Sequence, residues 1–242
     1  MKKIIKKLIP MRMKDSLRRS FYWYGIFPKR KKNIINQFHA LYYDDGLRFG
    51  RNTWRNTFWF GVPLKKCPFD LWIYQELLYK IKPDVVVECG TAYGGSAYYL
   101  ACLLDLLGKG RVVSIDIRQD EKRPQHERIT YLLGSSTSED ILAEVRKAIK
   151  GASTVLVILD SDHSKKHVLE ELRQYHSLVT MGSYLIVEDT NIYGHPVALE
   201  FGPGPMEALE AFLQENKNFV RDESAEKFYM TFNPKGYLKR VQ

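Results

Sequence analysis

Short apolar runs alternate with amphipathic segments along most of the chain. Runs such as residues 155–159 (VLVIL) contain only apolar side chains, which is typical of strands buried on both faces. Between the runs, apolar residues recur every three or four positions, as on one face of a helix. The expected strands cover residues 84–89, 111–117, 129–133, 154–160 and 182–188, and the expected helices cover residues 69–81, 95–107, 138–149, 165–176 and 205–216. This alternation predicts an α/β fold with a doubly wound, mostly parallel sheet.

The end of the chain has a different pattern. Residues 228–232 (FYMTF) and 237–241 (YLKRV) are two short segments with the composition of strands, and they are close in sequence. We interpret them as a pair of edge strands. The sheet is therefore expected to have an antiparallel C-terminal edge.

The first 32 residues are strongly basic. They contain 12 of the 37 lysines and arginines and a single acid, Asp15, whereas the rest of the chain contains 25 bases and 27 acids. The net charge of +9 thus belongs to this leader, and the near-neutral remainder does not support nucleic-acid binding. Basic residues interleaved with apolar ones and with an aromatic cluster at 21–24 suit an anionic membrane surface. A solvated tail, or contact with another subunit, would explain the pattern as well.

Residues 33–66 carry many aromatic side chains and turn signals, and we interpret them as a linker or cap in front of a catalytic domain at 67–242. The apolar runs of residues 1–32 are too short for a membrane span or a signal peptide. The three cysteines lack zinc-site or CxxC spacing, which suits a reducing compartment. We therefore expect a cytoplasmic protein, with peripheral contact to the inner face of the cytoplasmic membrane through residues 1–32.

Three carboxylates stand at the ends of two apolar strands. Asp160 ends the strand at 154–160, while Glu188 and Asp189 end the strand at 182–188. If these strands are neighbours, their ends lie roughly 5 Å apart. Buried acids are costly without a cation or strong donors, so the three could converge on one divalent ion such as Mg²⁺. The alternative for the Glu188–Asp189 pair is a helix cap.

A glycine turn follows the strand at 84–89. Gly90 allows the backbone to approach a ligand closely, but its spacing from Gly94 does not match the GxGxxG fingerprint of dinucleotide-binding proteins. Asp116 ends the next strand, where a carboxylate can accept both hydroxyls of a ribose. A purely structural turn with a helix cap is the alternative. Further along, Ser135 and Ser136 would suit contact with an adenine ring, or simply an N-capping loop.

His163 is a candidate general base. It lies three residues beyond Asp160, and an ordinary imidazole pKa near 6.5 lets it accept a proton close to neutrality. Asp162 is a competing acid, but it is also placed to cap the helix at 165–176. The loop that contains Asn191 and His195 could form the wall of an acceptor pocket.

Several segments of the chain, which include the strand ends and turns described above, resemble the cephalosporin hydroxylase/rhamnosyl O-methyltransferase family of class I S-adenosylmethionine (SAM)-dependent methyltransferases. The resemblance is carried by CPFDLWIYQE (67–76), ECGTAYGGS (88–96), SIDI (114–117), GSSTSE (134–139), ILDSDHS (158–164), GSYLIVEDTNIYGHPV (182–197), FGPGPMEA (201–208) and FNPKGYLKR (232–240). A literal hydroxylase of the 2-oxoglutarate type needs two histidines and a carboxylate, usually with an HxD or HxE triplet. None of the six histidines begins such a triplet.

The resemblance implies a Rossmann-like class I methyltransferase fold and a role for each candidate residue. SAM would be bound by Glu88, Gly90, Thr91, Tyr93, Ser96, Asp116, Ser135, Ser136 and Asp160; Mg²⁺ or a similar ion by Asp160, Glu188 and Asp189; the acceptor would face Asp162, Asn191 and His195; and His163 would be the general base. The resemblance also implies a homo-oligomer.

The sequence thus predicts a metal-dependent O-methyltransferase acting on a sugar hydroxyl, of rhamnose or a similar deoxysugar, in cell-surface glycan or natural-product biosynthesis. A nucleotide-dependent oxidoreductase on the same type of sheet is an alternative, which the missing GxGxxG disfavours. A non-catalytic binding protein is a second alternative, which the complete set of acids with His163 disfavours.

Overall fold

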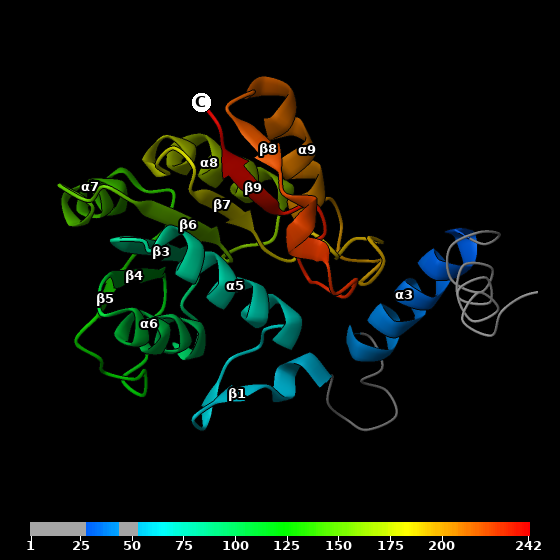
Figure 1. Cartoon of the computed structure of the whole chain (residues 1–242), viewed down its shortest axis with the longest axis horizontal. Helices are drawn as coiled ribbons and strands as arrows, with labels where there is room; N and C mark the ends of the chain where they lie inside the picture. Colours follow the sequence, from blue (N-terminus) through cyan, green and yellow to red (C-terminus); the bar gives the residue numbers. More distant parts are fainter. Residues whose placement is uncertain (1–27, 44–52) are drawn as a thin grey trace, which may run out of the picture.

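The computed structural model describes residues 28–43 and 53–242 (Figure 1). One sheet dominates, with the strand order β5-β4-β3-β6-β7-β9-β8. Its strands are β3 (Val85–Cys89), β4 (Arg111–Asp116), β5 (Ile129–Leu133), β6 (Val155–Leu159), β7 (Tyr184–Val187), β8 (Phe219–Arg221) and β9 (Tyr237–Arg240). The strands β3 to β7 pair in parallel, while β9 is antiparallel to both β7 and β8. The expected mostly parallel sheet with an antiparallel C-terminal edge is confirmed.

Helices cover both faces of the sheet. They are α5 (Pro68–Ile81), α6 (Gly95–Leu107), α7 (Glu139–Ala148), α8 (Lys165–Tyr175) and α9 (Pro205–Glu215). Helices α5 and α6 share one hydrophobic core with one face of the sheet, and α7, α8 and α9 share a second core with the other face. In β6, for example, Val157 points into the second core and Ile158 into the first. Burial on both sides is the physical reason for the uninterrupted apolar runs.

The predicted strand at 228–232 is wrong. Residues 228–232 are not in a strand, and β8 pairs with β9 in their place. Tyr229 has φ 65°, in the left-handed region that an extended strand does not use. Met230 and Phe232 instead form a small core with Cys67, on which Tyr42, Tyr43 and Trp54 pack. The apolar positions of this segment are thus buried against the N-terminal part of the chain and not in the sheet.

The N-terminal elements are α3 (Pro28–Tyr43), the 3₁₀ helix η2 (Thr53–Asn56) and the hairpin β1 (Phe58–Trp59)–β2 (Val62–Pro63). Helix α3 crosses the boundary that we expected at residue 32. Most of the basic leader, residues 1–27, lies outside the described residues. So do the expected turn signals at 44–46 and 51–53, apart from Thr53. Among the helices that the structure describes, none has the length and apolarity needed to cross a membrane.

The strand order reverses between β3 and β6. The two strands are parallel neighbours, and the chain leaves their carboxyl ends in opposite directions, towards β4 on one side and β7 on the other. Such a switch point opens a crevice at the carboxyl edge of an α/β sheet, where ligands bind. The expected cofactor and metal residues follow the strands that meet there.

Candidate active site

Gly90 lies directly beside the end of β6. A Cβ atom added to Gly90 would lie 1.8 Å from the carbonyl oxygen of Asp160, and the φ of Gly90 is +99°. Only glycine fits a position that is both this close to another backbone and in this conformation. The neighbouring backbones are tied by a hydrogen bond of 2.8 Å from Asp160 N to Cys89 O. The glycine turn therefore has a backbone role at the switch point, as its sequence indicated.

Glu88 is a fully buried acid with an unused oxygen. Its Oε2 accepts a hydrogen bond from Ser114 Oγ at 2.6 Å, and Thr91 Oγ1 lies 2.7 Å from the same hydroxyl. Glu88 Oε1 has no well-aligned hydrogen-bond partner among the described residues. Burial raises the pKa of Glu88, although the charge of Lys66 and hydrogen bonds with Ser114 and Ser96 oppose this effect. A buried carboxylate oxygen without a donor is costly, and a cationic amino group in the adjoining crevice would satisfy it.

Asp116 is held across the glycine turn at the end of β4. Its carboxylate accepts hydrogen bonds from the backbone N–H groups of Ala92 at 2.8 Å and Arg118 at 2.9 Å. Arg123 Nη2 lies 3.2 Å from Asp116 Oδ2, and Arg123 Nε donates to the Ala92 carbonyl. These contacts fix the Asp116 carboxylate at the carboxyl edge of the sheet, next to the turn that follows β3. Arg123 was not among the residues that the sequence indicated.

The remaining expected cofactor residues lie in loops at the same edge. Ser136 Oγ donates to Glu171 Oε1 at 2.6 Å, while Ser135 Oγ lies 3.1 Å from Thr137 Oγ1. The hydroxyl of Ser136 is therefore engaged with α8, and that of Ser135 lies within the loop before α7. Tyr93 is exposed, and Ser96 is buried in the first turn of α6. A role of these four residues in binding SAM stays a prediction.

His163 stands between two carboxylates at the carboxyl ends of β6 and β7. Its Nε2 atom lies 3.2 Å from Asp160 Oδ1 and 3.1 Å from Asp189 Oδ2. The ligand atoms of these three side chains all lie within 4.8 Å of one another, a spacing at which they could hold a metal ion. The two carboxylates suit Mg²⁺ or a similar hard ion, whereas the imidazole is a ligand for softer ions such as Zn²⁺ and is free to act as a base beside a Mg²⁺ ion.

Glu188 has other partners than the sequence led us to expect. Its Oε1 accepts hydrogen bonds from Lys66 Nζ at 2.5 Å and from Tyr74 Oη at 2.6 Å. Lys66 Nζ also donates to Asp160 Oδ2. A buried ammonium thus lies between Asp160 and Glu188, in the place where we expected an ion. The role of Glu188 as a metal ligand stays a prediction.

Burial and mutual contact perturb the acids and bases of this cluster. Burial and the charge of Asp160 raise the pKa of Glu188 to about 8, although Lys66 counteracts them. Burial alone would lower the pKa of His163, but the carboxylates of Asp189 and Asp160 outweigh it and raise that pKa well above 6.5. Burial alone would raise the pKa of Asp160, but Lys66 and His163 lower it. Asp160 and Asp189 are thus the carboxylates of this cluster that remain available to a cation, and a divalent ion there would displace the proton of His163.

Lys66 and Tyr74 are site residues that the sequence reasoning missed. Both belong to the segment around CPFDLWIYQE, which carried the family resemblance but held no strand-end acid. A single buried lysine has no periodic signature, because its position depends on where the segment before α5 crosses the sheet. The one available signal was the position of Lys66, directly before the stretch that resembles the family.

The three expected acceptor residues are placed differently from one another. Asp162 Oδ1 accepts from Ser164 N at 2.8 Å, which stabilises the start of α8. Asn191 is fully buried, and neither polar atom of its side chain has a partner within the described chain. His195 Nε2 lies 2.7 Å from Glu207 Oε1. A contact of these residues with an acceptor stays a prediction.

Residues 51–241 match the family model of rhamnosyl O-methyltransferase/CmcI. The rhamnosyl O-methyltransferase of Mycobacterium tuberculosis (strain ATCC 25618/H37Rv) is 36% identical over 222 residues, which cover 89% of this chain and 88% of that protein. The protein of the same name from Mycobacterium leprae is 36% identical over 223 residues, covering 89% of this chain and 94% of that protein.

Solved structures with a similar fold include two of CmcI. An apo structure is 23% identical with a TM-score of 0.60, and each chain is covered to 80%. A structure of CmcI with Mg and SAM is 21% identical with a TM-score of 0.59, again with 80% coverage of each chain. At this level of identity the likeness shows the Rossmann-like methyltransferase fold.

Proposed function

Because the chain belongs to the rhamnosyl O-methyltransferase/CmcI family, we propose that it transfers a methyl group from SAM to a hydroxyl of rhamnose or a similar deoxysugar. The observation that carries this proposal is the arrangement at the switch point. A buried acid with an unused oxygen, Glu88, lies on one side of Gly90, and the cluster of Asp160, His163 and Asp189 follows the neighbouring strands. A cofactor crevice next to a cation site and a base suits methyl transfer to an alcohol.

The residues around the glycine turn fit SAM. Glu88 Oε1 would accept a hydrogen bond from the amino group of the methionine part, and the carboxylate of Asp116 would accept from the ribose hydroxyls. Gly90 lets the turn after β3 pack directly against the Asp160 backbone, which brings the cofactor residues of β3 next to the acids that follow β6. When bound, SAM supplies an electrophilic methyl group on a sulfonium.

The acids after β6 and β7 fit a divalent cation. Asp160 and Asp189 would bind it, with Glu188 as a further predicted ligand if Lys66 shifts. When bound, such an ion supplies positive charge that lowers the pKa of a nearby acceptor hydroxyl. Its charge would also oppose the effect of the carboxylates on His163, so that the imidazole is neutral and able to accept a proton.

His163 would then act as the general base. Its Nε2 atom takes the proton of the acceptor hydroxyl as the oxygen–carbon bond forms and the carbon–sulfur bond breaks, and S-adenosylhomocysteine leaves. Positioning of the hydroxyl in line with the methyl group supplies much of the remaining acceleration. The acceptor would lie against the loop that contains Asn191 and His195.

We further propose that the methylated sugar belongs to a cell-surface polysaccharide or a natural product. The strongly basic first 32 residues favour peripheral contact with the inner face of the cytoplasmic membrane, where carrier-linked glycans are assembled. Flotation with anionic vesicles, comparing the full chain with a form that lacks residues 1–32, tests this contact. Equal binding of the two forms would reject it. The homo-oligomer implied by the family resemblance is tested by light scattering of the purified chain.

The proposed reaction is tested with the purified full-length protein, SAM carrying a labelled methyl group, Mg²⁺ and rhamnosides. We expect label in the sugar, with the methylated position read by mass spectrometry, and loss of transfer after metal removal by EDTA. Transfer that persists at full rate without metal would contradict the scheme. In parallel, S-adenosylhomocysteine should raise the melting temperature, whereas stabilisation by NAD instead would favour an oxidoreductase.

A further inference from the structure

A cavity of about 440 Å³ lies between α3 and the loops that face it. Its wall is formed by residues of α3, by the turn around His195 and by the segment that precedes β9. Figure 1 shows α3 on the side of the molecule that carries these loops. The volume is within the range of binding sites for small molecules, which is about 300–1,000 Å³.

His39 lines this cavity and is almost fully buried. Only 3% of its surface is exposed, and neither ring nitrogen has a well-aligned hydrogen-bond partner in the described part of the chain. Burial lowers the pKa of His39, although a hydrogen bond with the Tyr229 backbone opposes this effect, so its imidazole is neutral and offers one N–H group. A buried N–H group without a well-aligned acceptor is costly, and a ligand oxygen in the cavity would satisfy it.

The cavity wall carries more positive than negative charge. Lys31, Lys32 and Lys235 line it, together with one acid, Glu226. Glu226 Oε1 accepts the backbone N–H of Lys235 at 2.8 Å, so part of its charge is already satisfied by the protein. The ammonium of Lys31 lies 4.0 Å from the centre of the Tyr229 ring, and that of Lys235 lies 3.1 Å from Glu210 at the surface. An anion with several oxygens would complement both these ammonium groups and the His39 donor.

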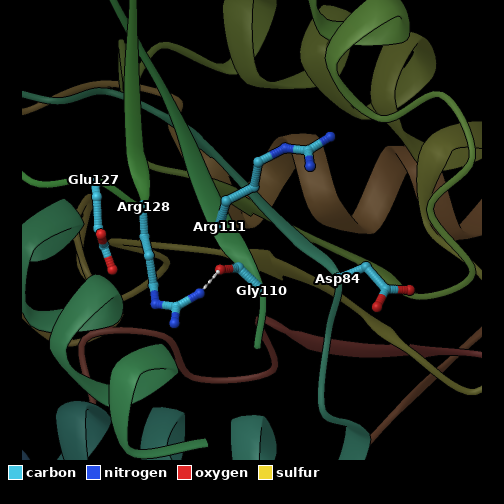
Figure 2. A pocket seen from close by; sticks show the side chains of 5 residues that line it. All are labelled: Asp84, Gly110, Arg111, Glu127 and Arg128. Atoms are coloured by element: carbon cyan, nitrogen blue, oxygen red, sulfur yellow. Dashed lines mark hydrogen bonds between the residues drawn. The ribbon is translucent and has the colours of Figure 1, made fainter. Parts of the chain in front are cut away.

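A second cavity shows why positive charge alone is insufficient. It also has about 440 Å³ and lies at the amino ends of the strands, where it is lined by Asp84, Gly110, Arg111, Glu127 and Arg128 (Figure 2). Unlike the cavity beside α3, it has no buried side chain among its lining residues, and its charged groups Asp84 and Arg128 pair within the protein. Arg128 donates to the Gly110 carbonyl, as drawn in Figure 2, and also to Asp105 at 2.5 Å. Asp84 pairs with Lys109 at 2.7 Å.

One loop connects the cavity beside α3 to the candidate active site. It begins at Asp189 and passes through His195, which lines the cavity. Glu207 then holds both His195 and the backbone N–H of Gly204, at 2.7 and 2.8 Å. A Cβ atom added to Gly204 would lie 3.3 Å from the carbonyl oxygen of His163. A ligand in the cavity and a sugar at His163 would therefore contact the same loop.

We infer that the cavity beside α3 binds the diphosphate through which the acceptor sugar is attached to its carrier. The inference rests on the proposed function, because it assigns the acceptor of that reaction to the class of sugar diphosphates. A nucleotide and a polyprenol lipid are both carriers that present this group. The diphosphate would accept hydrogen bonds from His39 and from the lysines, while the sugar extends along the loop towards His163.

Binding is measured by titration calorimetry of inorganic diphosphate into the full-length protein, with EDTA present so that no metal complex forms. The double variant Lys32→Gln/Lys235→Gln should bind diphosphate at least about tenfold more weakly, and raised salt should weaken binding to the unchanged protein. Lys109→Gln is the matched control, because Lys109 and Lys235 have similar exposure and each pairs with one carboxylate. It should bind as the unchanged protein does. His39→Leu, which removes the buried donor, should weaken binding further.

Equal binding of diphosphate to the unchanged protein and the double variant, or no binding to either, would overturn the inference. S-adenosylhomocysteine should bind all variants with the same affinity, which verifies their folding independently of the cavity. Even if His39→Leu does not fold, the lysine variants, whose side chains are exposed, still decide the question.

The link to catalysis is tested with three acceptors: a nucleoside diphosphate rhamnose, a farnesyl diphosphate-linked rhamnose and methyl rhamnoside. At least one of the diphosphate-linked sugars should have a KM about tenfold or more below that of methyl rhamnoside, and the double variant should remove this advantage. Equal KM values for all three would refute the assignment of the acceptor class. If none is methylated while the double variant still loses diphosphate binding, the proposed function fails and the anion site stands.

Discussion

The two edges of the sheet use charged residues in opposite ways. At the amino edge, Asp84 pairs with Lys109 and Asp105 pairs with Arg128 in contacts that are open to solvent. At the carboxyl edge, Lys66 lies between Asp160 and Glu188, and both Lys66 and Glu188 are buried. Exposed pairs contribute about 0–1 kcal/mol, whereas a buried ion pair has a large desolvation cost. Burial of like charges, rather than the number of charges, therefore distinguishes the edge of the sheet that carries the candidate active site.

The substitution Asp160→Asn, at the carboxyl edge, should have the largest effect on turnover. It removes charge from the cation site without a large change in volume, and we expect turnover to fall by about 10⁴-fold or more. The measurement is methyl transfer at saturating SAM, with S-adenosylhomocysteine affinity as the control for folding. Asp84→Asn is the matched change at the amino edge and should leave turnover within about twofold, because its effect is confined to an exposed pair. Similar losses in the two variants would refute the contrast.

The substitution His163→Gln should separate base catalysis from metal binding. Turnover should fall by about 10²–10⁴-fold, since the proton of the acceptor hydroxyl loses its acceptor. Mg²⁺ affinity, measured by calorimetry, should change much less than turnover if His163 is the base. A parallel loss of Mg²⁺ affinity would show that His163 acts as a metal ligand through its contacts with Asp160 and Asp189.

The substitution Lys66→Met should show how much the buried acids Asp160 and Glu188 destabilise the folded protein when they lose their shared cation. Removing this cation leaves Asp160 and Glu188 without their shared partner, and we expect the free energy of unfolding to fall by about 3–5 kcal/mol. Lys109→Met, at the amino edge, should lower it by about 0–1 kcal/mol. Both values come from urea unfolding. Added Mg²⁺ should restore stability to Lys66→Met more than to the unchanged protein, and a loss below that of Lys109→Met would contradict the proposed role of Lys66.

The pH dependence of stability should also differ between the two edges. Asp70, on α5, accepts hydrogen bonds from Thr231, Phe232 N and Tyr237, and burial raises its pKa from 3.8 to about 6. The folded protein thus keeps a proton that the unfolded chain has lost, so the contribution of Asp70 to stability declines by about 3 kcal/mol as the pH rises from about 4 to about 6.

Asp70→Asn should remove this decline, which is measured as the difference between variant and unchanged protein in urea unfolding across that pH range. At the amino edge, the hydrogen bond from Lys109 lowers the pKa of Asp84. The contribution of Asp84 to stability, which is smaller than that of Asp70, is therefore present above the ordinary pKa of an aspartate and is lost as the pH falls. An identical pH profile for the unchanged protein and Asp70→Asn would refute the raised pKa.

Most of the fold could be predicted from the sequence because it depends on local patterns. The five parallel strands and the five helices that cover them end within two residues of the expected bounds, since buried runs and amphipathic periods are set by neighbouring residues. The segment 228–232 was misjudged for the opposite reason. Its apolar residues are buried by Cys67 and by α3, which lie far away in the sequence, and no local pattern reports such a contact.

Acids and a histidine follow particular strands in the sequence, and this order sets the edge of the sheet on which they lie. The partners of each side chain depend on how the chain folds. Folding places His163 between Asp160 and Asp189, inserts Lys66 between Asp160 and Glu188, and buries His39 without a well-aligned partner. The difference is one of range: backbone periodicity acts over a few residues, whereas a charge or a donor is satisfied by whatever the folded chain brings within about 3 Å of it.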